Sequence, residues 1–92
     1  MINITEAETL IKTLQVEYCS EAISGGGFKF SMRLSKEPER LFLITIAEFS
    51  DRPEWECVYS LFLNRKIVMS NGGNFINAIE GLKRFIELSI AC

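Results

Sequence analysis

The sequence predicts an α+β domain in the order α-β-β-β-β-α, an antiparallel meander sheet with both helices packed on one face. Three observations lead to this prediction. Apolar residues recur at three- and four-residue spacing near both ends of the chain, whereas they alternate with polar residues or run continuously in the middle. Short turn sequences separate the middle segments. A chain of 92 residues forms one small core, so 1–92 is expected to be a single domain.

The first helix is expected to begin at Thr5, because Glu8 follows three residues later in a capping-box pattern. Its apolar stripe consists of Ile4, Ala7, Leu10, Ile11 and Leu14. The pattern allows the helix to continue through Tyr18 and Ala22, until the glycines at 25–27 end it.

Four strands are expected between the helices. Apolar and polar residues alternate in 28–35, which predicts a strand with one buried and one solvated face. The segment 41–47 is almost continuously apolar and is therefore expected in the centre of the sheet. The third strand is expected over 55–63. A tight turn at 64–66 then leads to a short fourth strand over 67–69.

The final helix is expected after 70–74, where either Asn71 or Asn74 can cap it. Its apolar stripe consists of Phe75, Ala78, Ile79, Leu82, Phe85, Ile86 and Ile90. Gly81 lies inside this helix, where glycine costs about 1 kcal/mol relative to alanine. We therefore expect Gly81 to permit a close approach.

Helices on one side leave the other face of the sheet uncovered. The side chains expected there are Lys29, Ser31 and Arg33, then Glu56, Val58, Ser60 and Phe62, and either Leu41, Leu43 and Thr45 or Phe42, Ile44 and Ile46. A face that mixes basic, polar and apolar groups is typical of a protein-binding surface. A homodimer contact, or tolerated exposure of apolar atoms, is the alternative.

Charge narrows the class of partner. Ten Lys and Arg against twelve Asp and Glu exclude a general nucleic-acid binder held by phosphate neutralisation. The sign alternates along the chain, with net charges of −3 in 1–24 and 48–56 and +2 in 25–47 and 57–92. This alternation suits docking on a specific protein surface, with ordinary solvated charge as the alternative.

The candidate contact residues are two basic side chains on the first strand, and one asparagine and two basic side chains at the hairpin tip. They are Lys29, Arg33, Asn64, Arg65 and Lys66. An arginine there can grip a carboxylate or a phosphate with two parallel hydrogen bonds. Trp55, beside an acidic loop, is interpreted as a core residue of the third strand in preference to an interface anchor.

Residues for catalysis and metal binding are scarce. The chain has no histidine, so no Cys–His or Ser–His nucleophile pair can form. The spacing of Cys19, Cys57 and Cys92 matches no zinc motif. The carboxylates next to Pro38 and Pro53 lie at expected turns, whereas a general acid needs a desolvated pocket. We therefore expect no enzyme activity, cofactor or metal.

Two glycine-containing segments invite a nucleotide- or RNA-binding interpretation. Neither 25–27 nor 71–74 has P-loop spacing, so both are interpreted as loop and cap sequences. The Gly-Gly loop before the last helix resembles that of double-stranded RNA-binding domains. Those domains grip phosphates with lysines at the start of this helix, whereas here the first basic residues are Lys83 and Arg84. Such a nucleic-acid module is kept as an alternative.

Four features of the whole chain are considered together. They are its length, the expected helix-flanked sheet, the opening MINITEAETL and the glycine run before the Phe28-Lys29-Phe30 sequence. Taken whole, the chain resembles small phage-encoded anti-CRISPR proteins that inhibit the type I-F CRISPR surveillance complex. These inhibitors share no short motif, so the resemblance supplies no site residues.

The resemblance implies a non-enzymatic inhibitor that binds protein subunits of the guide-RNA complex and blocks recognition or hybridisation of target DNA. Contact with the guide RNA is left open. The expected location is the cytoplasm of the infected bacterium, because neither a secretory signal nor an apolar run of about 20 residues is found. The protein is expected to be a monomer that binds neither a membrane nor a small-molecule substrate. A homodimeric phage or bacterial interaction domain is the alternative.

Overall fold

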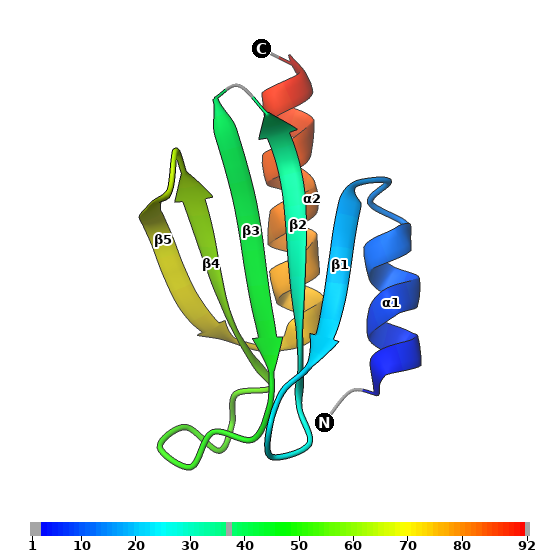
Figure 1. Ribbon diagram of the computed structural model, residues 1–92, viewed down its shortest axis with the longest axis vertical. Helices are drawn as coiled ribbons and strands as arrows, with labels where there is room; N and C mark the ends of the chain where they lie inside the picture. Colours follow the sequence, from blue (N-terminus) through cyan, green and yellow to red (C-terminus); the bar gives the residue numbers. More distant parts are fainter. Residues whose placement is uncertain (1–2, 37, 92) are drawn as a thin grey trace.

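The computed structural model describes residues 3–36 and 38–91 and, within the last helix, the side chains of 75–84 and 86. In this part of the chain the elements are α1 (Ile4–Lys12), β1 (Glu17–Ala22), β2 (Phe28–Lys36), β3 (Glu39–Ile46), β4 (Cys57–Leu63), β5 (Lys66–Gly73) and α2 (Phe75–Ala91). The sheet order is β1-β2-β3-β4-β5 with every neighbouring pair antiparallel, as Figure 1 shows. The predicted α+β class and the antiparallel meander are confirmed.

The expected number of strands, four, is wrong, because the residues expected to extend the first helix form β1. Helix α1 ends at Lys12, and Gln15 then adopts a positive φ of 56°. Leu14, Tyr18 and Ala22 lie four residues apart, a spacing that fits a helix of period 3.6 and a strand of period 2 equally well. Their periodicity therefore could not distinguish the two structures.

The glycine run at 25–27 joins two strands instead of ending a helix. Gly25 and Gly26 both have positive φ, and the Ile23 N–H donates to the Gly27 carbonyl oxygen at 3.0 Å. The turn lets the whole of β1 pair with β2, from Ala22 opposite Phe28 to Glu17 opposite Arg33.

The cap of α1 lies before the expected position. The Asn3 side chain, not that of Thr5, accepts the N–H of Glu6 at 2.8 Å, and its amide donates back to the Glu6 carboxylate at 3.2 Å. This reciprocal pair spans three residues, as a capping box does, and it satisfies the free backbone N–H of Glu6 in the first turn.

Strand β5 is longer than the short strand expected over 67–69. Its residues 70–73 continue the ladder with β4, from Ser70 opposite Ser60 to Gly73 opposite Cys57. The helix then starts from Asn74, whose side chain accepts the N–H groups of two residues in the first turn at 2.9 and 3.2 Å. Of the two asparagines expected as caps, the structure selects the second.

Both helices pack on one face of the sheet, as predicted. Helix α2 runs behind the sheet, and α1 lies beside β1 (Figure 1). The buried residues of the two helices and of β2, β3 and β4 form one cluster. Its members are Ala7, Ile11, Phe28, Phe30, Met32, Phe42, Ile44, Ile46, Cys57, Leu61, Phe75, Ala78, Ile79 and Leu82. The stripe residues Phe85 and Ile90 lie outside the described side chains. None of the described helices is long and apolar enough to cross a bilayer.

Candidate functional site

The face of the sheet turned away from the helices is the candidate binding surface, called the open face below. Its central strand β3 buries Phe42, Ile44 and Ile46, so the strand period turns the other set outward. The open face consists of Glu17, Cys19, Glu21, Lys29, Ser31, Arg33, Leu41, Leu43, Thr45, Val58, Ser60, Phe62, Ile67, Ser70 and Gly72. The structure thus decides between the two possibilities that the sequence left open.

Glu56 does not join the open face, contrary to expectation. Its carboxylate accepts the N–H of Phe75 at 3.0 Å, at the first residue of α2. A negative charge at this end of a helix is stabilised by the helix dipole. Glu56 therefore serves as a second cap beside Asn74.

One row of the open face combines apolar side chains with an arginine. Arg33, Leu41, Phe62 and Ile67 occupy successive register positions on β2, β3, β4 and β5. At about 4.8 Å per strand, the row extends about 14 Å across the sheet. We call these four residues the Arg33 row. The part of the open face on β1 and β2 is polar, whereas the part on β3 to β5 is mainly apolar.

Lys29 does not gather with Arg33, although both lie on β2 and face the same side. They are four residues apart, or about 13 Å along the strand. The Lys29 ammonium forms an ion pair with the Glu21 carboxylate at 2.8 Å, and this contact lowers the pKa of that carboxyl. The positive charge of Lys29 is therefore neutralised by Glu21 on the neighbouring strand.

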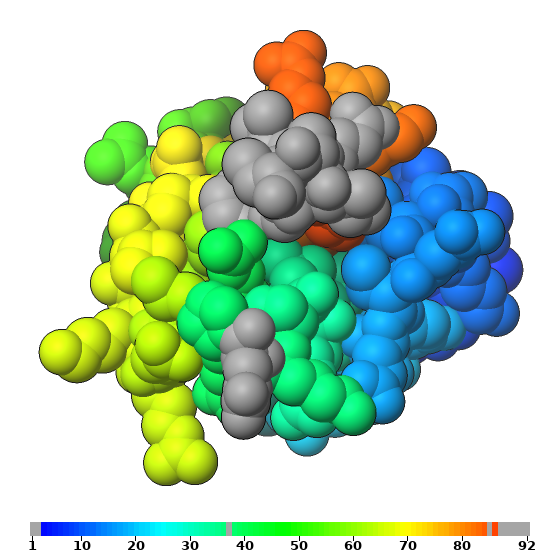
Figure 2. All heavy atoms as spheres, turned by 90° about the horizontal axis from the view of Figure 1, so that it is seen from above, coloured from blue at the N-terminus to red at the C-terminus, as the bar shows by residue number. Residues whose placement is uncertain are grey.

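The hairpin tip contains one structural residue and two exposed cations. Asn64 and Arg65 have φ values of 48° and 70°, a left-handed turn that asparagine adopts readily. The Asn64 side chain accepts the Glu39 N–H at 3.1 Å, and its own N–H donates to the Glu39 carbonyl oxygen at 2.9 Å. Asn64 thus fastens the turn to β3. Arg65 and Lys66 remain candidates for contact, and side chains from this end of the sheet project farthest from the body in Figure 2.

Trp55 is not a core residue of a strand, contrary to expectation. It lies in the loop 47–56 before β4 and is half-buried. The face of its indole covers Gly72: a Cβ built there would lie 2.4 Å from the ring carbon Cε3. The Arg52 guanidinium lies 5.4 Å from the ring centroid, and the Phe49 ring packs edge-on at 6.5 Å. These contacts hold the loop against the open face of β5.

The two described cysteines differ in burial. Cys57 is fully buried, and its thiol donates to the Gly73 carbonyl oxygen at 3.5 Å. Burial, assisted by the adjacent Glu56 carboxylate, raises the pKa of the Cys57 thiol to about 11. Cys19 is exposed on the open face. Among the described residues, no three His, Cys, Asp or Glu side chains gather closely enough to hold a metal ion.

Sequence reasoning missed the Arg33 row and the position of Trp55. The row depends on the register of four strands, which no local pattern encodes. The signal for Trp55 was Gly72, since a glycine inside a strand often marks a close approach by another group. Compared with models of protein families, with curated proteins and with solved structures, the chain matches none.

Proposed function

We propose that this protein is a non-enzymatic binding domain that inhibits the type I-F crRNA-guided surveillance complex by occupying one of its protein surfaces. Recognition or hybridisation of target DNA is thereby blocked. The observation that carries a binding function is the Arg33 row on the open face. The choice of this complex comes from the resemblance of the whole chain to anti-CRISPR proteins.

The Arg33 row has the composition of an interface centre. Leu41 and Phe62 are half-buried, and Ile67 is 62% exposed, so all three retain apolar surface to bury. Burial of such surface contributes about 25 cal/mol per Å². Aromatic residues and arginine are enriched where interfaces are most sensitive to truncation. The paired strands fix the backbone of these residues, so little backbone ordering is required on binding.

The charge of the site indicates the chemistry of the partner surface. Arg33 lies at one end of the Arg33 row, with Glu17 of β1 opposite it in the register, and Ile67 lies at the other end, directly after the cations Arg65 and Lys66 in the chain. An apolar patch with carboxylates at its rim is complementary to this arrangement. Arg33 can bind such a carboxylate through two parallel hydrogen bonds.

The alternative of double-stranded RNA binding has less support at the end of α2. A phosphate would bind there through the free N–H groups of the first turn. Those groups are engaged instead by Asn74 and by the carboxylate of Glu56. A negative side chain thus occupies the position that a phosphate would need.

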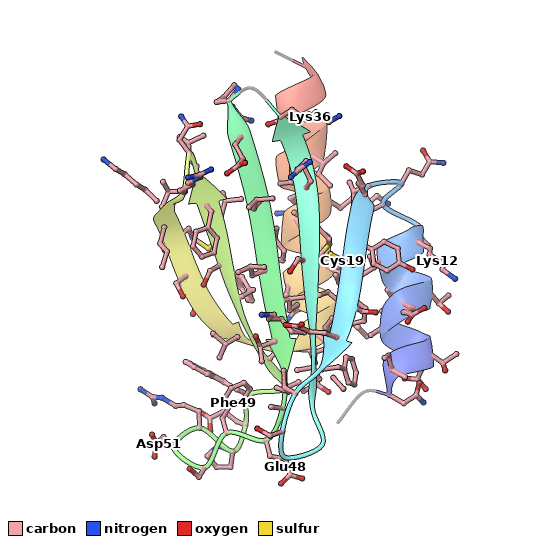
Figure 3. All side chains as sticks on the ribbon, viewed as in Figure 1. Lys12, Cys19, Lys36, Glu48, Phe49 and Asp51 are labelled. Atoms are coloured by element: carbon pink, nitrogen blue, oxygen red, sulfur yellow. The ribbon has the colours of Figure 1, made fainter. Side chains whose placement is uncertain are left out.

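The test is binding of the purified protein to a type I-F surveillance complex, with and without target double-stranded DNA. The wild-type protein is expected to bind and to exclude the DNA. Arg33→Glu and Phe62→Thr should each weaken binding at least about tenfold, the loss expected of an interface-centre residue. Lys12→Glu, on α1, changes the net charge equally and should bind like the wild type (Figure 3).

Two results would contradict the proposal. Absence of wild-type binding removes the surveillance complex as the target. Wild-type affinity in both Arg33→Glu and Phe62→Thr, with unchanged melting temperatures, removes the Arg33 row as the contact surface.

A further inference from the structure

The outer edge of β5 is a second surface with the features of an interaction site. Since β5 is the last strand of the sheet, its outward N–H and C=O groups face no further strand in the described part of the chain. Three consecutive apolar residues of this strand are exposed: Ile67 by 62%, Val68 by 54% and Met69 by 41%. The opposite edge strand, β1, instead carries Glu17 and Glu21.

Opposite charges flank the two ends of β5. Arg65, in the turn before the strand, and Lys66, the first residue of the strand, supply two positive charges. The loop 47–56 lies at the other end of the strand and holds four acidic residues against one arginine. The Glu56 N–H donates to the Gly73 carbonyl oxygen at 2.9 Å, which fixes this loop beside the end of β5. In Figure 3, Asp51 lies at the outer tip of the loop, on the β5 side.

This charge distribution is complementary to itself. A second copy placed antiparallel along β5 brings the basic end of each strand to the acidic end of the other, and both ends attract at once. If the pair is centred on Met69, residues equally distant from it face each other. Lys66 then lies opposite Gly72 of the second copy, beside the Trp55 and the acidic loop of that copy. A parallel arrangement would instead oppose like charges.

An apolar hollow next to Met69 lies where the second copy would pack. It has a volume of about 130 Å³ and lies between α2, where Gly81 and Leu82 line it, and the strands β3 to β5, of which β5 contributes Met69. A Cβ built on Gly81 would meet no atom within 4 Å, so the expected close approach at Gly81 does not occur within this chain. The hollow is smaller than the ~300 Å³ of typical small-molecule sites. A methionine of the second copy fits it better, because this side chain adapts to irregular apolar gaps.

We propose that the protein forms a two-fold homodimer by antiparallel pairing of β5 with β5 of a second copy. This proposal replaces the expectation of a monomer. It goes beyond the proposed function: the contact uses the edge of the sheet and leaves Arg33, Leu41 and Phe62 uncovered, although it shares Ile67, Arg65 and Lys66 with the proposed binding surface. Once β5 is paired, its edge is no longer available to another copy. The edge strands of the joined sheet are then the two β1 strands, whose acidic residues disfavour addition of further copies.

The expected dimer is weak. The eight residues of β5 extend about 26 Å. A contact made by one pair of edge strands and the neighbouring side of one helix in each copy buries less surface area than a standard interface. The Val68 bulge interrupts the ladder and further limits pairing. Sedimentation equilibrium of the wild-type protein should therefore show a monomer–dimer equilibrium with Kd of roughly 10–100 µM. Added salt should shift it towards monomer, because charge pairs at both ends contribute.

A charge exchange tests the geometry. The acidic-tip variant carries Arg65→Glu and Lys66→Glu, and the basic-loop variant carries Asp51→Lys and Glu54→Lys. In a homodimer of either variant, like charges would face each other at both ends of the β5 contact, so each variant alone should stay monomeric. An equimolar mixture restores both attractions and should form a heterodimer at wild-type concentrations.

A matched control separates local pairing from attraction between net charges. Lys83→Glu with Arg84→Glu, on the exposed side of α2, has the net charge of the acidic-tip variant and should not associate with the basic-loop variant. Circular dichroism checks that each variant is folded. If a double variant does not fold, the single change Lys66→Glu or Glu54→Lys is used in its place. A monomeric wild type up to about 500 µM, self-association of either charge variant, or equal association of the control would overturn the proposal.

Discussion

Replacing Gly72 with alanine is expected to displace the indole of Trp55 and destabilise the protein. The added Cβ would lie 2.4, 2.6 and 2.7 Å from three carbons of the ring, whereas ordinary contacts begin at 3.4 Å. Gly72 does not have a positive φ, so the contact itself and not backbone strain causes the loss.

The magnitude follows from the distance that the ring must move. Relief of the closest contact requires a shift of about 1 Å, which also loosens the packing of Trp55 on Arg52 and Phe49. Overpacking of this kind costs about 1–3 kcal/mol. In a domain of this size, each 1 kcal/mol lowers the melting temperature by about 4–8 °C.

The assay uses intrinsic fluorescence, because Trp55 is the one tryptophan in the sequence. Gly72→Ala should shift its emission to longer wavelength and lower the urea midpoint. Gly81→Ala is the matched control: its Cβ meets nothing within 4 Å, so it should raise stability by up to about 1 kcal/mol without changing the emission. Wild-type emission and stability in Gly72→Ala, measured at a few micromolar, would refute this account of the contact.

Three further predictions concern the thiols and the hairpin tip. Because the folded Cys57 thiol has a pKa of about 11 against an ordinary 9.0, the unfolded chain loses this proton first as the pH rises. Stability should fall by up to about 3 kcal/mol between pH 9 and 11, at about 1.4 kcal/mol per pH unit, and urea titrations of Cys57→Ala should lack this component. In a Cys92→Ala background, a thiol reagent should label Cys19 within the mixing time and Cys57 only on unfolding, as mass spectrometry of the labelled peptides can check. Asn64→Ala should lower the free energy of unfolding by about 1–2 kcal/mol in thermal unfolding, because it removes the acceptor for the Glu39 N–H and places alanine at a φ of 48°. Asn64→Asp keeps an acceptor and should therefore retain most of the wild-type stability.

Local patterns predicted much of the fold. The alternation in 28–35 and the apolar run in 41–47 became β2 and β3, because side chains alternate across a strand wherever it lies. Asn74 was among the caps expected for α2, since an N-cap acts on its own first turn. The boundaries of β5 were predicted less well, because its residues 70–73 have turn composition and are held as a strand only by pairing with β4.

Assignments that rest on distant contacts failed. A four-residue spacing of apolar side chains could not separate the helix expected through Tyr18 from β1, and pairing with β2 decides the matter. Trp55 looked like a strand residue until the structure placed its ring on Gly72. The structural role of Asn64 was not foreseen either: its side chain accepts the N–H of Glu39, and its role in partner contact stays a prediction.

By itself, the sequence determined the α+β class, the meander and the face that each helix buries, because periodicity is a property of neighbouring residues. Tertiary structure decided the additional strand and which residues share a surface. Register is the reason: residues such as Arg33 and Ile67 meet in one row only after three strand pairs have formed, and each pair is held by contacts between segments far apart in the chain. The same pairing leaves β5 at the edge of the sheet, between a basic turn and an acidic loop.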